Sequence, residues 1–75
     1  MPHSPLSYRQ VERRLRAAGF RPSAAHGSHV RFVHRTATET RTVIVPRHHE
    51  IAVGALRSIV RQAGLSPAEF ERLSP

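Results

Sequence analysis

The sequence predicts an α+β fold in which a three-stranded antiparallel sheet and helices form a two-layer sandwich. Two segments with the three- and four-residue apolar spacing of a helix stand on either side of three segments with strand character. Glycines, prolines or polar runs separate these segments, which is typical of turns. The predicted order is helix, three strands and helix, followed by a short terminal helix.

The first helix is expected over residues 8–18. Ser7 and Gln10 form the Ser-x-x-Gln pattern of a capping box, in which each side chain accepts a hydrogen bond from the backbone amide of the other residue. Apolar side chains recur on one face at Tyr8, Val11, Leu15 and Ala18. Gly19 follows and suits the left-handed conformation that often closes a helix.

The first two strands are expected on either side of a turn at Gly27-Ser28. Residues 20–26 have weak strand character, and Pro22 has no amide hydrogen, so this strand is expected to be short or to lie at the sheet edge. Residues 29–35 are richer in β-branched and aromatic side chains. Alternation predicts Val30, Phe32 and His34 on the core side, and His29, Arg31, Val33 and Arg35 on the open face.

A polar hairpin loop over residues 35–40 leads to a third strand at residues 42–45, which Pro46 ends. Apolar residues fall on both faces of this strand, so periodicity does not indicate which face is buried. A second amphipathic helix is expected from Val53 to Ala63, with Gly64-Leu65 closing it. Ser66-Pro67-Ala68-Glu69 predicts a capping box that starts the short last helix. This order is the topology of double-stranded RNA-binding domains, although fold alone assigns no function.

The charge of the chain indicates a polyanionic partner. Twelve arginines and no lysine stand against five glutamates, which gives a formal net charge of +7 and a pI near 11.9. A small domain with this charge attracts phosphate backbones first and acidic proteins second. The planar guanidinium of arginine suits phosphate oxygens in particular.

Several classes of protein are excluded or disfavoured. The chain contains no cysteine, so it forms neither disulfides nor cysteine zinc sites. No apolar run approaches the ~20 residues that cross a membrane, and the N-terminal residues do not resemble a signal peptide. We therefore expect a single cytoplasmic domain over residues 1–75 that does not bind a membrane.

Three segments contain short motifs that together resemble one protein family. Gly27-Ser28-His29 with Phe32 is similar to a Gly-Ser-His-x-x-Phe signature, and Val45-Pro46-Arg47-His48 is similar to a Val-Pro-x-His segment. Residues 54–65 resemble a second-helix pattern that begins Gly-Thr-Leu-Arg-x-Ile and ends Gln-Ala-Gly-Leu. These motifs belong to the HicA toxins, and the resemblance covers about residues 7–66, which we expect to be the core of the domain.

The resemblance implies a toxin that cleaves mRNA without a metal or other cofactor and that a HicB-type antitoxin holds inactive. It also implies that His29 is the catalytic residue. Metal-free cleavage of RNA requires removal of a proton from the 2′-hydroxyl and donation of one to the leaving 5′-oxygen. Histidine, with a pKa near 6.5, can do either at neutral pH, and Arg31 beside it can hold a phosphate.

The second proton-transfer group is less well defined by the sequence. His48 and His49 both follow the third strand, and His48 is preferred because it belongs to the Val-Pro-x-His motif; the alternative is a polar turn. His26 flanks the predicted turn and is given no chemical role. The residues expected to contact RNA or the antitoxin are Ser28, Arg31, Arg47, Arg57 and Arg61, although Arg57 and Arg61 also fit a solvated helix face.

The sequence leaves two other functions open. A non-catalytic basic RNA-binding module of the same fold would read duplex shape through backbone and 2′-hydroxyl contacts. A basic domain that binds only an acidic protein would have no affinity for RNA. Zinc ligand types occur in His26-x-x-His29 and in His48-His49-Glu50, but neither segment supplies the four ligands of a structural site, and no metal is expected.

Overall fold

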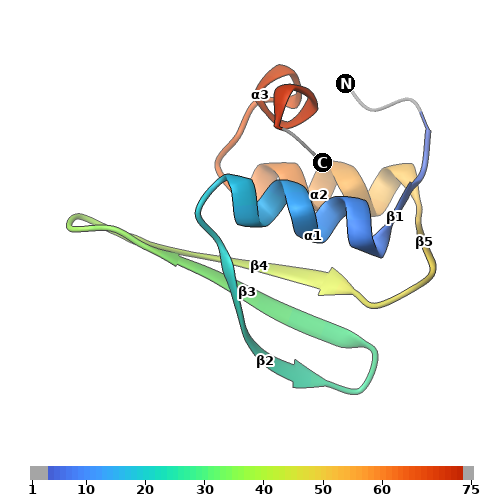
Figure 1. The fold of residues 1–75 in the computed structure, drawn as a ribbon, viewed down its shortest axis with the longest axis horizontal. Coiled ribbons are helices and arrows are strands. Elements are labelled where there is room, and N and C mark those ends of the chain that lie inside the picture. Colours follow the sequence, from blue (N-terminus) through green and yellow to red (C-terminus); the bar gives the residue numbers. More distant parts are fainter. Residues whose placement is uncertain (1–3, 74–75) are drawn as a thin grey trace.

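The computed structural model describes residues 4–73 and shows the predicted α+β sandwich. Helices α1 and α2 lie next to each other on one face of a three-stranded antiparallel sheet, and the short helix α3 follows them (Figure 1). The main elements are α1 (Tyr8–Ala17), β2 (Arg21–His26), β3 (His29–Arg35), β4 (Thr40–Pro46), α2 (Val53–Gln62) and α3 (Pro67–Arg72). The strand order is β2-β3-β4, so the weakly predicted strand is formed, at an edge of the sheet.

A second, two-stranded sheet was not expected. β1 (Leu6–Ser7) pairs in antiparallel fashion with β5 (Glu50–Ile51), which ties the start of α1 to the start of α2. Both helices therefore begin at the end of the molecule that also holds the turn between β2 and β3 (Figure 1).

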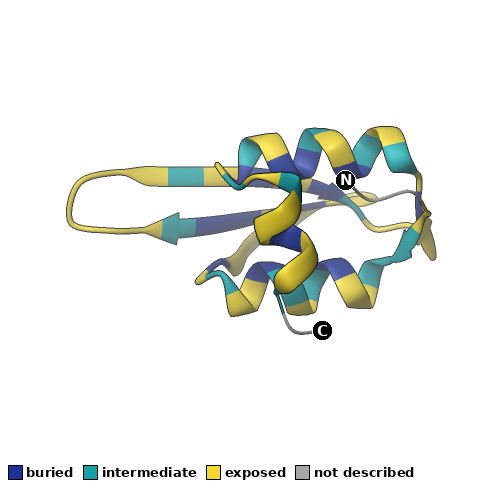
Figure 2. Cartoon of the chain, turned by 90° about the horizontal axis from the view of Figure 1, so that it is seen from above, coloured by how far each residue is buried: buried dark blue, intermediate teal, exposed yellow. Residues whose placement is uncertain are grey.

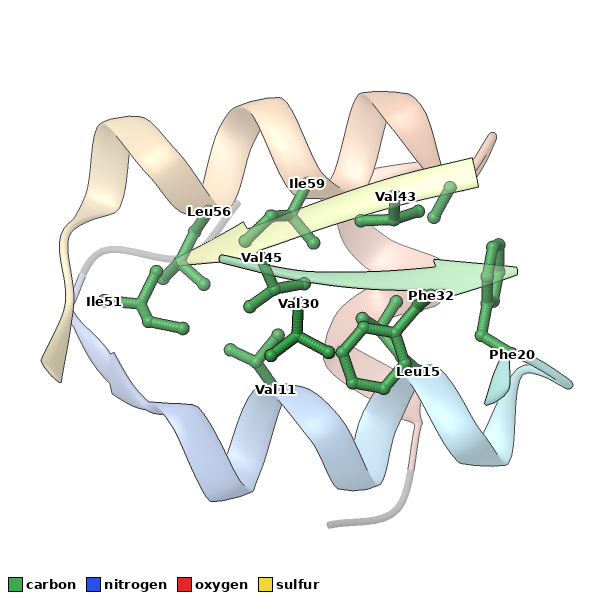
Figure 3. Packing of buried hydrophobic residues seen from close by; sticks show 11 residues of the cluster. Val11, Leu15, Phe20, Val30, Phe32, Val43, Val45, Ile51, Leu56 and Ile59 are labelled. Carbon is green, nitrogen blue, oxygen red and sulfur yellow. The ribbon is translucent and has the colours of Figure 1, made fainter. Parts of the chain in front are cut away.

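The core fills the space between the sheet and the two long helices. α1 contributes Val11 and Leu15, and α2 contributes Leu56 and Ile59 (Figure 3). The sheet contributes Val30, Phe32, Val43 and Val45, all buried. The apolar pattern of β4 did not indicate which of its faces is buried. The structure shows that Val43 and Val45 face the core, whereas Ile44 between them is 42% exposed.

One prediction for β3 needs correction. Val33 was expected on the open face of the sheet, exposed to solvent like His29, Arg31 and Arg35. It is buried instead, although it does not belong to the main core cluster. Its cross-strand partners are Arg21 on β2 and Thr42 on β4, so it lies on the central strand of the sheet with a paired residue on either side. Exposure of the open face is therefore concentrated at the two ends of β3.

The predicted helix ends are confirmed. Ser7 and Gln10 form the first capping box, with backbone-to-side-chain hydrogen bonds of 2.9 and 3.1 Å, and Ser66 and Glu69 form the second, at 2.7 and 3.0 Å. Hydrogen bonds from the backbone and hydroxyl of Ser66 hold the pKa of Glu69 below its usual value. Gly64 closes α2 with a φ of +74°.

Gly64→Ala is expected to destabilise the fold. The residue has a left-handed φ, which costs an L-residue about 1–2 kcal/mol, and an added Cβ would meet the guanidinium of Arg41. For a domain of this size we expect the melting temperature, followed by circular dichroism, to fall by roughly 5–15 °C. Gly54→Ala in the same helix is the control, because its Cβ would point into open space and alanine favours helix. A Gly64→Ala melting temperature equal to that of wild type would contradict this explanation.

Candidate functional site

A tight turn places two histidines opposite each other. β2 ends at His26 and β3 begins at His29, and the two are direct cross-strand partners. Gly27 has a φ of +58°, whereas no residue other than glycine in the described chain has a positive φ. A glycine of this kind at the first central position is typical of the type II′ turn, which matches the twist of the strands it joins. The two-residue Gly27-Ser28 turn therefore fixes His29 as the first residue of β3, directly opposite His26.

The side chain of His29 lies on the open face of the sheet, meaning the face away from α1 and α2. Successive residues of a strand point to opposite faces, and Val30 and Phe32 point into the core. His29 and Arg31 consequently share the open face, as predicted, and both are exposed. Figure 2 shows exposed residues at this end of the sheet and at the hairpin tip, with buried ones between.

The chain after β4 returns to this turn. Pro46 is the β4 partner of His29, and the amide of Arg47 donates a hydrogen bond to the carbonyl of Ser28. This pairing brings the backbone before His48 alongside Ser28 and His29. His48 and His49 are both exposed, and no hydrogen bond in the described chain connects either side chain to His29.

Arg47 directs its side chain elsewhere. Its guanidinium carbon lies 5.8 Å from the centroid of the Tyr8 ring, on the helix side of the sheet. Burial, and then the charge of Glu12, raise the pKa of Tyr8, while Arg47 and Arg16 oppose this. The same residues border a groove of about 320 Å³ lined by Tyr8, Arg9, Glu12, Arg13 and Arg47. Arg47 is thus separated from Arg31 by the sheet.

Arg57 and Arg61 lie on another surface again. α2 turns Leu56, Ile59 and Val60 inward, which leaves the two arginines exposed on the outer side of the helix layer. The structure does not bring them together with His29.

The end of the molecule that holds His29 is electrostatically suited to anions. Both α1 and α2 begin there, and neither has an acidic residue in its first turn; helix N-termini favour negative charge. Among residues 4–73, ion pairs form only at Arg16 with Glu12 and at Arg41 with Glu39. Most arginines therefore keep their full charge available to a ligand.

Sequence reasoning missed the position of His26. The sequence analysis predicts only that His26 flanks the turn, whereas the register makes it the direct partner of His29. The signal was present, because a two-residue hairpin turn at Gly27-Ser28 makes the residues before and after it a pair. The described residues contain no cluster of three or more histidine or glutamate side chains that could bind a metal ion.

Comparison with protein families matches residues 8–65 to the HicA toxin of bacterial toxin–antitoxin systems. This match spans most of the 75-residue chain. The chain belongs to the HicA toxin family. The resemblance inferred from the Gly-Ser-His, Val-Pro-x-His and second-helix motifs is confirmed, and membership implies an antitoxin partner. No curated protein sequence matches the chain significantly. None of the helices described is both long and apolar enough to span a membrane.

Proposed function

We propose that the chain is the toxin of its pair and a metal-independent endoribonuclease that cleaves mRNA, with His29 as a catalytic acid or base. Toxins of the HicA family are generally of the ribonuclease type. The observation that supports this most strongly is the position of His29, exposed on the open face immediately after a tight turn. Action on mRNA would take place in the cytoplasm.

The proposed reaction needs no group beyond those of the chain and the RNA. The 2′-hydroxyl loses its proton to a base and attacks the adjacent phosphorus, and the 5′-oxygen leaves as it receives a proton from an acid. A histidine can take either part near neutral pH. Arg31 lies on the same face and can hold a non-bridging phosphate oxygen. The sequence-based second group, His48, remains a candidate for the other part.

A HicB-type antitoxin is proposed to inhibit the toxin by covering the open face and neutralising its charge. Ser28 and Arg31 lie beside His29, and an inhibitor that reached them would also exclude RNA. Arg47, Arg57 and Arg61 lie on other surfaces and are proposed as further contacts to RNA or to the antitoxin. The net charge of +7 would attract either RNA or an acidic antitoxin surface.

The test is incubation of the purified chain with an mRNA transcript in the presence of EDTA. Discrete cleavage products are expected, because none of the proposed steps uses a metal. RNA that is bound but stays intact would favour the alternative, a non-catalytic RNA-binding module of the same fold. No RNA binding at physiological salt would instead favour a domain that binds only an acidic protein, since phosphate contacts produce measurable affinity even without sequence specificity.

A further inference from the structure

We propose that His26 is the second proton-transfer group, and that His26 and His29 divide the acid and base parts of RNA cleavage between them. The inference rests on the proposed ribonuclease function and extends it to a residue for which the sequence predicts no chemical role. Its basis is the register of β2 and β3, in which His26 and His29 are partners across the Gly27-Ser28 turn.

The register fixes both side chains on one face. Residues directly opposite in an antiparallel pair point to the same side of the sheet, with Cβ atoms about 4.5–5.5 Å apart. Ala25 and Val30, the next pair, point to the other side, and Val30 is buried in the core. His26 and His29 are both exposed, so the open face presents two adjacent imidazoles to solvent.

The backbone of His29 is also tied to His26. On β4, the backbone amide of Ile44 points away from β3 and donates a hydrogen bond to Oε1 of Gln62 at 2.9 Å. The backbone amide of Arg47 points the other way and donates to the carbonyl oxygen of Ser28. Alternation along an antiparallel ladder then makes His29 and Pro46 a non-hydrogen-bonded pair. The backbone hydrogen bonds of His29 are accordingly directed to β2, where its partner is His26. The Cβ atoms of two residues paired at a closed hairpin end keep a nearly constant separation.

This separation suits the reaction. In an in-line displacement the attacking 2′-oxygen and the leaving 5′-oxygen lie on opposite sides of the phosphorus, so the base and the acid must approach one phosphodiester from two sides. One imidazole starts neutral and takes the 2′-proton, and the other starts protonated and gives its proton to the 5′-oxygen. Arg31, two residues along β3 and so about 7 Å away, can reach a non-bridging oxygen between them.

The other histidines of the described chain are less well placed. The ring of His34 lies 5.2 Å from that of Phe20, toward the end of the sheet away from the turn and outside the open-face pair. His48 and His49 lie in the connection after β4, beyond the last paired residue of the sheet, so the strand pairing does not hold them. Within residues 4–73, His26 is the only other histidine that combines exposure, the same face as His29 and a position fixed by strand pairing.

The experiment compares two versions of one synthetic RNA that contains the cleavage site mapped in the transcript. One version has the natural 5′-oxygen at the scissile bond, and the other has sulfur there, because a thiolate leaves without needing a proton. With the natural RNA, His26→Gln and His29→Gln are each expected to slow single-turnover cleavage by about 10²- to 10⁴-fold. With the 5′-sulfur RNA, only one of the two variants, the one that lacks the acid, should recover to within about tenfold of wild type.

His34→Gln is the matched control and should cleave both RNAs at the wild-type rate, and thermal unfolding should show that all variants are folded. Wild-type cleavage by His26→Gln would overturn the proposal, and His48 would then be the next residue to replace. A His26→Gln defect that is equal on both RNAs, with neither variant recovering, would also overturn it and indicate that His26 only binds RNA. Failure of the wild-type chain to cleave would refute the ribonuclease function itself.

Discussion

Replacing His29 with glutamine is expected to abolish growth arrest when the chain is induced in bacterial cells, and to leave a reporter mRNA intact. General acid or base catalysis by one side chain contributes typically 10²- to 10⁴-fold to a rate, and mRNA decay slower by this factor would not stop growth. Glutamine retains a polar side chain of similar size. Since His29 is exposed, the change in folding free energy should stay within about 0.5 kcal/mol.

The measurement pairs growth curves with northern analysis of the reporter at equal soluble expression. Purified His29→Gln should still bind the RNA, because the arginines that supply the electrostatic attraction are unchanged. His34→Gln on the same strand is the control and should remain toxic. If His29→Gln were as toxic as wild type and cut the same RNA, the enzyme class would survive, but His29 would lose its place in the mechanism.

The fold was largely predictable because its determinants are local. Each helix start has its own capping box or apolar spacing, and Gly19, Gly27 and Gly64 mark the chain reversals at which a positive φ is required. The pairing of Leu6–Ser7 with Glu50–Ile51 was not predictable. Two-residue strands have no periodicity to detect, and the contact depends on how the two helices pack.

The candidate site was predictable in its central residue but not in its surroundings. Alternation along β3 placed His29 and Arg31 on the open face, because the apolar Val30 and Phe32 require the other side. The burial of Val33 could not be read from alternation, since it depends on the side chains of both neighbouring strands. Likewise, the Val-Pro-x-His motif indicated Arg47 without its direction, which the contact with Tyr8 determines.

Phe32→Ala is expected to lower the free energy of unfolding by about 3–5 kcal/mol, which is typical of a phenylalanine removed from a core. Phe32 is completely buried between the sheet and α1 (Figure 3). A chain of this length has a total stability of roughly 4–11 kcal/mol, so the substitution removes a large share of it. Urea unfolding followed by circular dichroism measures the loss. Ile44→Ala on the adjacent strand removes an exposed apolar side chain and should cost no more than about 1 kcal/mol.

His29 and Phe32 belong to the same Gly-Ser-His-x-x-Phe motif, yet they have different physical roles. They lie three positions apart on β3, so the side chain of His29 points to the open face and that of Phe32 points into the core. Both substitutions should remove toxicity, but His29→Gln should do so as a folded protein that binds RNA, and Phe32→Ala by depleting the folded chain. Lowering the temperature or adding an osmolyte such as trimethylamine N-oxide, which favours the compact state, should therefore partly restore cleavage by Phe32→Ala and not by His29→Gln. A Phe32→Ala chain that is stably folded but still inactive would mean that the aromatic ring contributes to the site and not only to the core.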